Sequence, residues 1–143
     1  MPLITSVTNI LTKALPKVLS SKEHAAADYC ISGAFLLMGG LFWQRNKRAA
    51  IGSLACGTTL LGISLLTDYP GGIRNTIALP THARIDLGVA AMVATMPEFL
   101  EFRDEPEERF FLLQAALLAA MSNLTEVEKK LVLHEPREHL RAA

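Results

Sequence analysis

Hydrophobic residues gather in four long segments of the chain, and most charged residues lie between or outside these segments. Residues 25–43 and 49–67 are 19 residues each, with Asp28 as the only charged residue of the first and none in the second. Residues 110–125 also lack a charge, and residues 85–102 have an uncharged core at residues 87–97. A helix of about 20 apolar residues crosses the hydrocarbon core of a bilayer. The pattern therefore predicts four helices that cross a membrane.

Small residues within these segments favour a membrane bundle over a soluble one. Helices in lipid associate through close backbone contacts, whereas each glycine costs a soluble helix about 1 kcal/mol relative to alanine. Short polar links at residues 44–48 and 103–109 predict two antiparallel hairpins. A soluble bundle is the alternative, because residues 85–102 alone would fit a buried helix. The glycines of the first two segments are Gly33, Gly39, Gly40, Gly52, Gly57 and Gly62.

The chain repeats itself at an offset of 58 positions. Residues 24–68 align with residues 82–126 without a gap, and ten of the 45 aligned positions are identical. Several identities are polar, which a shared hydrophobic composition does not explain. The repeat predicts that one helical hairpin has been duplicated. The polar identities include His24 with His82, Asp28 with Asp86, Ser64 with Ser122 and Thr67 with Thr125.

We therefore predict an all-α, integral membrane four-helix bundle made of two duplicated helical hairpins. Residues 1–22 are expected to form an amphipathic helix in the membrane interface. Residues 23–126 form the membrane domain, with repeats at 24–68 and 82–126, and residues 127–143 form a polar C-terminal tail. The hairpins are expected to run the same way, related by an approximate two-fold axis. The first helix of each hairpin then begins, and the second ends, at the same end of the bundle.

Six side chains with metal-binding chemistry are predicted to meet at that end. In each repeat a histidine and an aspartate are four positions apart and share a helix face, and the repeat ends in threonine and an acid. Carboxylates at membrane depth need a partner or a cation. Imidazole and carboxylate ligands suit zinc, iron, manganese or copper. The candidate ligands are His24, Asp28, Asp68, His82, Asp86 and Glu126.

Other uses of these residues stay open. The histidine and aspartate pairs can hold helix ends together in a non-catalytic membrane protein that assembles with itself or with a partner. The two histidines can also be the axial ligands of a haem in an electron carrier. If the protein is an enzyme, residues 68–75 form a lid and Arg74 or Arg84 holds an anionic substrate group. Tyr29 and Tyr69 are interpreted as interface anchors.

The charge balance and the cysteines narrow the function further. Fourteen basic and fourteen acidic residues give a net charge of zero, so no overall field favours nucleic-acid binding. Cys30 and Cys56 lie in apolar segments without Cys-x-x-Cys spacing, and both are expected to be small buried residues. The sequence has no phosphate-binding glycine loop and no Ser-His-Asp pattern, so it predicts no particular reaction.

The order of Asp86, Gly88 and Pro97 resembles a family of small bacterial membrane proteins named for a Ser-Pro-Trp (SPW) repeat. In that family an aspartate near a helix start precedes a glycine and then Ser-Pro-Trp near the helix end, in two helical hairpins. Met96 and Glu98 stand here in place of the serine and the tryptophan. The resemblance covers residues 24–125 and implies a multi-pass protein of the bacterial inner membrane, with the lipid bilayer as its partner. It implies no reaction.

Overall fold

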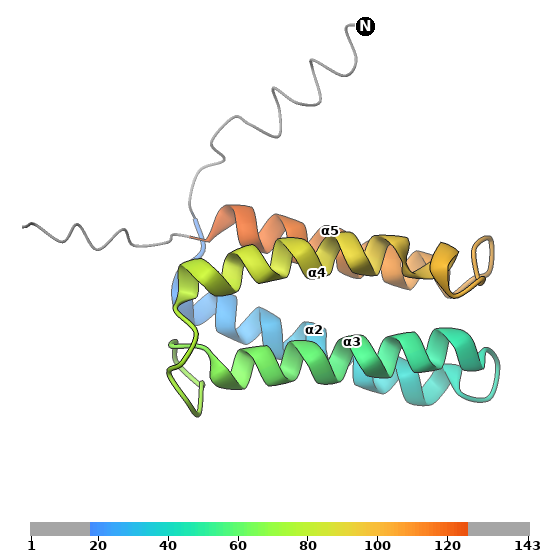
Figure 1. Cartoon of the computed structure of the whole chain (residues 1–143), viewed down its shortest axis with the longest axis horizontal. Helices are drawn as coiled ribbons and strands as arrows, with labels where there is room; N and C mark the ends of the chain where they lie inside the picture. The colour runs from blue at the N-terminus through green and yellow to red at the C-terminus, as the bar shows by residue number, and fades with distance from the viewer. Residues whose placement is uncertain (1–17, 126–143) are drawn as a thin grey trace, which may run out of the picture.

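A computed structural model describes residues 18–125, which form four α-helices. These are α2 (Ser21–Phe42), α3 (Lys47–Leu66), α4 (Leu79–Phe99) and α5 (Glu108–Leu124). Figure 1 shows α2 and α3 as one antiparallel pair lying beside a second pair, α4 and α5. Within the described range, the all-α prediction is confirmed. Most of the expected N-terminal helix, residues 1–17, and the tail at residues 127–143 lie outside that range.

Local sequence signals set where the helices begin. The Ser20 hydroxyl accepts a hydrogen bond from the Glu23 backbone at 3.3 Å, and the Glu23 carboxylate accepts one from the Ser20 backbone at 2.8 Å. This reciprocal capping box starts α2. Pro80 lies in the first turn of α4, where its missing N–H would have no partner within the helix. Because α4 begins before the predicted apolar segment, both His-x-x-x-Asp motifs lie in the first turns of helices.

The hydrophobic core runs between the two hairpins. Phe35 of α2 and Phe111 of α5 are fully buried, and their ring centroids lie 5.8 Å apart at a steep angle. Phe102 packs against Phe111 with a centroid distance of 5.0 Å. Edge contacts of this kind stabilise aromatic pairs beyond the burial of their surface. Aromatic packing toward the end of the bundle with the two short turns therefore helps to hold the hairpins side by side, away from the polar residues at the other end.

Three of the six glycines in α2 and α3 allow close helix contacts. A Cβ atom on Gly57 would lie 2.9 Å from Leu36 Cγ and 3.0 Å from Phe35 Cβ. Gly39 and Gly52 approach neighbouring side chains within 3 Å in the same way. Of the six glycines, these three are packed closely against a neighbouring side chain. The other glycines would carry a Cβ with nothing within 4 Å: Gly33, Gly40 and Gly62.

Gly57→Ala is expected to destabilise the protein by about 1–3 kcal/mol, because the added methyl group overpacks the contact between α2 and α3. Gly62→Ala is the matched control, since the same methyl group on the same helix meets open space. Thermal unfolding of the two variants in detergent measures the difference. Equal melting temperatures would contradict the close contact at Gly57.

The outer surface of the bundle is apolar between the helix ends. Exposed charged residues of the four helices lie near helix ends, whereas the middle turns expose uncharged residues. Both α2 and α3 are long and apolar enough to cross a membrane. Cys56 is buried as expected, but the expectation was wrong for Cys30, which is exposed. The large exposed side chains of the helices include Leu37, Leu41, Ile51, Leu87, Met92, Leu113 and Leu117.

Opposite charges join the two short turns at the far end of the bundle. The Arg48 guanidinium lies 3.5 Å from the Glu101 carboxylate and 3.4 Å from that of Glu105. Arg45 Nε lies 3.8 Å from Oε1 of the buried Glu107. Exposed ion pairs of this kind each contribute about 0–1 kcal/mol to the free energy of unfolding. Their main effect is to favour one alignment of the two hairpins. The basic turn of one hairpin thus sets its alignment with the acidic turn of the other.

Candidate metal site

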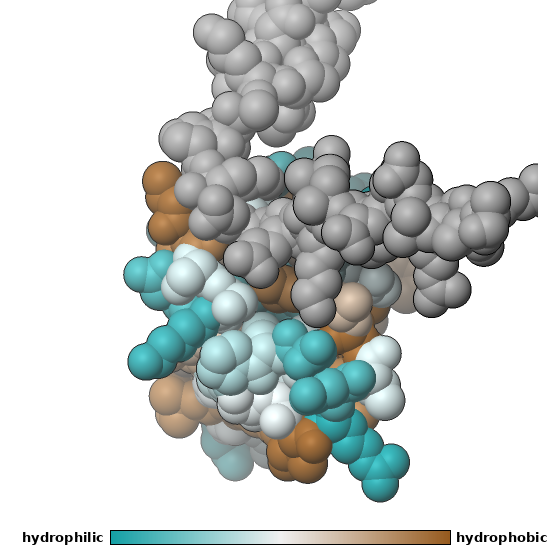
Figure 2. Space-filling view, turned by 90° about the vertical axis from the view of Figure 1, so that its left-hand side faces the viewer, coloured by the Kyte–Doolittle hydropathy of each residue, from teal (hydrophilic) through white to brown (hydrophobic). Residues whose placement is uncertain are grey.

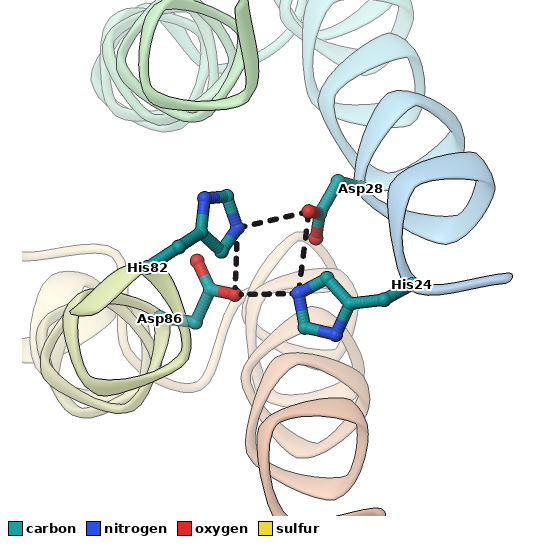
Figure 3. A group of neighbouring side chains, drawn as sticks. All are labelled: His24, Asp28, His82 and Asp86. Carbon is teal, nitrogen blue, oxygen red and sulfur yellow. Dashed lines mark hydrogen bonds and ion pairs between the residues drawn. The ribbon is translucent and has the colours of Figure 1, made fainter. Parts of the chain in front are cut away.

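Four of the six predicted ligands converge where α2 and α4 begin. His24 and Asp28 come from α2, and His82 and Asp86 come from α4 (Figure 3). All four side chains are buried. One ligand atom from each residue lies within 4.8 Å of the other three. Because each pair is separated by about one helical turn, each helix presents its histidine and aspartate together to the other helix.

The structure does not bring Asp68 into this group. Its side chain is exposed, and its backbone N–H donates to the Ile77 carbonyl at 2.8 Å. The preceding residue, Thr67, is fully buried instead. Glu126 lies outside the described residues. Among residues 18–125, four of the predicted ligands therefore lie together and Asp68 does not.

The four ligand atoms form a closed ring in which nitrogen and oxygen alternate (Figure 3). His24 Nε2 lies 3.3 Å from Asp28 Oδ2 and 3.1 Å from Asp86 Oδ2. His82 Nε2 lies 2.9 Å and 3.0 Å from the same two oxygens. Bonds of about 2.0–2.2 Å to a four-coordinate metal place neighbouring ligand atoms about 2.8–3.6 Å apart. The ring therefore has the dimensions of a four-coordinate metal site.

Two threonines determine which nitrogen of each imidazole carries a proton. Thr125 Oγ1 lies 2.5 Å from His24 Nδ1, and Thr67 Oγ1 lies 2.5 Å from His82 Nδ1. Each hydroxyl donates its own proton to a helix carbonyl four residues earlier, at 2.7 Å in both cases. The hydroxyl oxygen must then accept from the histidine. Both Nδ1 atoms are therefore donors, and both Nε2 atoms face the centre of the ring.

When the imidazoles are neutral with the proton on Nδ1, neither Nε2 atom can donate to the carboxylates of the ring. His82 Nε2 makes no aligned hydrogen bond with either nearby carboxylate, and Asp28 Oδ1 and Asp86 Oδ1 have no hydrogen-bond partner among residues 18–125. Buried polar atoms without partners cost about 1–3 kcal/mol each. A cation at the centre, or a second proton on each imidazole, would supply the missing positive charge.

Sequence reasoning missed the two threonines as parts of the site. The signal that would have found them is their identity in the repeat: Thr67 and Thr125 match, whereas the acids that follow them, Asp68 and Glu126, differ. In each case the threonine of one hairpin supports the histidine of the other. Neither hairpin therefore holds a complete site, and both must be in place to form it.

Backbone contacts around the site occur twice, at the same offset of 58 positions. Leu19, just before α2, donates to the Leu124 carbonyl at 3.1 Å, and Ile77, just before α4, donates to the Leu66 carbonyl at 2.9 Å. Figure 1 shows the starts of α2 and α4 and the ends of α3 and α5 at one end of the bundle. These bonds anchor the helix that carries each histidine to the helix end that carries its supporting threonine.

Tyr69 adds a phenol to one side of the ring. Its hydroxyl donates to Asp28 Oδ2 at 3.0 Å, and its ring centroid lies 5.4 Å from that of His82. Burial raises the pKa of the phenol well above its ordinary value, so the hydroxyl remains a donor at neutral pH. The interpretation of Tyr69 as an interface anchor was wrong, because its side chain is buried against the site.

No family model matches this chain, and neither a curated protein nor a solved structure matches it. The resemblance to the Ser-Pro-Trp repeat proteins therefore stays a prediction. The chemistry of the site rests on the ring of two imidazoles and two carboxylates and on the residues that orient them.

Proposed function

We propose that the chain is an integral membrane protein that binds one divalent transition-metal ion between its two hairpins. The buried ring of His24, Asp28, His82 and Asp86 carries this proposal. Two neutral imidazoles and two carboxylates have a total charge of −2, which one divalent cation neutralises. Neutralisation matters because uncompensated charge is costly in a buried site. Nitrogen and oxygen ligands in this ratio suit zinc, iron, manganese or copper.

The surface of the bundle supports insertion of all four helices into a bilayer. Beyond the two helices with sufficient length and hydropathy, α4 and α5 also expose large apolar residues, such as Met92 and Leu113. Ionisable residues of membrane bundles face the interior and pair with one another, as the four ring residues do. With the predicted resemblance, this favours a multi-pass protein of the bacterial inner membrane whose hairpins arose by duplication.

Two alternatives differ from this proposal in their chemistry. If both imidazoles carried two protons, the ring would consist of ion pairs and would only join α2 to α4. A haem held by the two histidines fits less well, because the carboxylate oxygens of Asp28 and Asp86 lie within 3.3 Å of the imidazole nitrogens. A porphyrin plane between the rings would have to displace both carboxylates.

Elemental analysis of the full chain, purified in detergent, tests the proposal. We expect about one transition-metal ion per chain, and its loss when His24→Ala and His82→Ala are combined, because the ring then keeps only two ligands. The matched control replaces the other two histidines of the chain, His134 and His139, with alanine. A wild-type protein without metal that also fails to bind added metal would contradict the proposal, as would equal metal content in both double variants.

A further inference from the structure

We propose that Tyr69 is the gate of the metal site. A metal ion enters the site from water, or leaves it, when the loop at residues 68–77 moves the Tyr69 side chain away from the ring. The inference rests on the proposed metal-binding function and adds a route of access to it. Tyr69 is only 7 % exposed although it lies in a loop whose other residues include Ile73, which is 76 % exposed. The loop thus turns one side chain inward at the end of the bundle.

The phenol ring covers both histidines on the side of this loop. Its centroid lies 5.4 Å from that of His82 and 6.4 Å from that of His24, while its hydroxyl reaches Asp28. One side chain therefore contacts or approaches ligands from both α2 and α4. Figure 2 looks onto this end of the bundle, where hydrophilic and intermediate residues lie at the centre of the visible face and hydrophobic residues lie around it.

Besides the backbone bonds from Ile73 and Thr76 to carbonyls at the end of α3, one side-chain hydrogen bond joins the loop to α2. The Tyr29 hydroxyl, on the helix that carries Asp28, donates to the Gly71 carbonyl at 2.6 Å. Gly71 has φ of +100°, a conformation that favours glycine, and a Cβ there would lie 3.3 Å from the Tyr29 ring. The loop is thus shaped to fit against α2 two residues after the gate.

The two tyrosines of the gate and its tether are not part of the repeated pattern. Positions 58 residues after Tyr29 and Tyr69 are Leu87 and Val127, neither of which can donate a side-chain hydrogen bond. The threonines and the ring residues, in contrast, are identical in both repeats. Neither tyrosine therefore has a counterpart 58 positions later, which places access on one side of a site with otherwise matched halves.

Metal-release kinetics of the loaded full chain test the gate. Wild-type protein is loaded with zinc, and transfer to an excess of a chromogenic chelator is followed by absorbance. Tyr69→Ala is expected to speed both release and uptake by at least about tenfold, since opening no longer exposes a buried aromatic ring. Tyr29→Phe is expected to act in the same direction but less strongly, and Ile73→Ala, in the exposed part of the loop, is the control.

The rates of metal release and metal uptake together show whether Tyr69 controls access or only stabilises the bound metal. A gate speeds uptake as well as release, so that affinity falls by less than the release rate rises. If Tyr69→Ala speeds release alone, with an equal loss of affinity, Tyr69 stabilises the bound metal rather than controlling access, and the inference is wrong. It is also wrong if both rates stay at the wild-type values.

A second measurement does not depend on metal. In a background with His134→Gln and His139→Gln, the remaining histidines are His24 and His82, and their acylation by diethyl pyrocarbonate reports access to the ring. We expect slow acylation of the metal-free protein and at least about tenfold faster acylation with Tyr69→Ala. Equal rates would overturn the gate even if the protein binds metal. A faster rate in a protein that binds no metal would keep the gate and reject the proposed function.

Discussion

Asp86→Asn is expected to weaken metal binding by about 10²–10⁴-fold, equivalent to about 3–5 kcal/mol. Asparagine has nearly the same shape as aspartate but no charge, so a divalent ion in the ring would keep only the carboxylate of Asp28. The ring is buried, and one unit of positive charge would remain uncompensated there. Competition with a chelator of known affinity measures the dissociation constants of the wild type and the variant.

Asp68→Asn is the matched control for this experiment. It makes the same chemical change at an exposed carboxylate in the first repeat, outside the ring, and is expected to leave affinity unchanged. Melting temperatures with and without metal add a second comparison, because a ligand stabilises the folded state by an amount that grows with the logarithm of its affinity. If Asp86→Asn lowered both melting temperatures equally and left the affinity intact, the ring would be a structural ion-pair network and not a metal site.

Thr67→Val is expected to lower metal affinity by about 10–100-fold, the usual effect of losing a group that orients a ligating histidine. Valine matches threonine in shape but cannot accept the proton of His82 Nδ1. The imidazole could then turn its protonated nitrogen toward the centre of the ring, where a metal needs a lone pair. Thr125→Val should reduce affinity by a similar factor, because Thr125 supports His24 at the same distance of 2.5 Å.

Two further variants show whether this effect comes from the hydroxyl group. Thr67→Ser keeps the hydroxyl and should retain most of the affinity. Thr58→Val removes an exposed threonine hydroxyl from α3, the helix that Thr67 caps. This hydroxyl donates to helix carbonyls, and its loss should have no effect on metal affinity. Wild-type affinity in both Thr67→Val and Thr125→Val would contradict the orienting role of these threonines.

Segment lengths were sufficient to predict the helices, because a run of about 20 apolar residues between polar links has few other stable conformations. The same is true of the four ring residues. A spacing of four places histidine and aspartate on one face of any helix, and the repeat requires that two such faces exist. The sequence did not locate the start of α4, because Leu79 and Pro80 precede the apolar segment from which that helix was predicted.

The two acids at the ends of the repeats show where helical spacing stops being informative. The predicted segment ran to Thr67 with Asp68 directly after it, but the helix ends at Leu66 and Thr67 is an extended cap with φ −88° and ψ 141°. Beyond that cap the helical direction of side chains no longer applies. Thr67 therefore points to the site and Asp68 to solvent. Thr125 has a similar extended conformation at the end of α5, with φ −74° and ψ 130°.

Local spacing and the repeat specify the helices, their pairing into hairpins and the two histidine and aspartate pairs. The other side chains of the site could not be predicted in this way. Thr67, Thr125 and Tyr69 reach the ring through contacts between segments far apart in the chain or through the path of a loop. Such contacts depend on how helix ends meet in space, and no periodic pattern within a single helix specifies that.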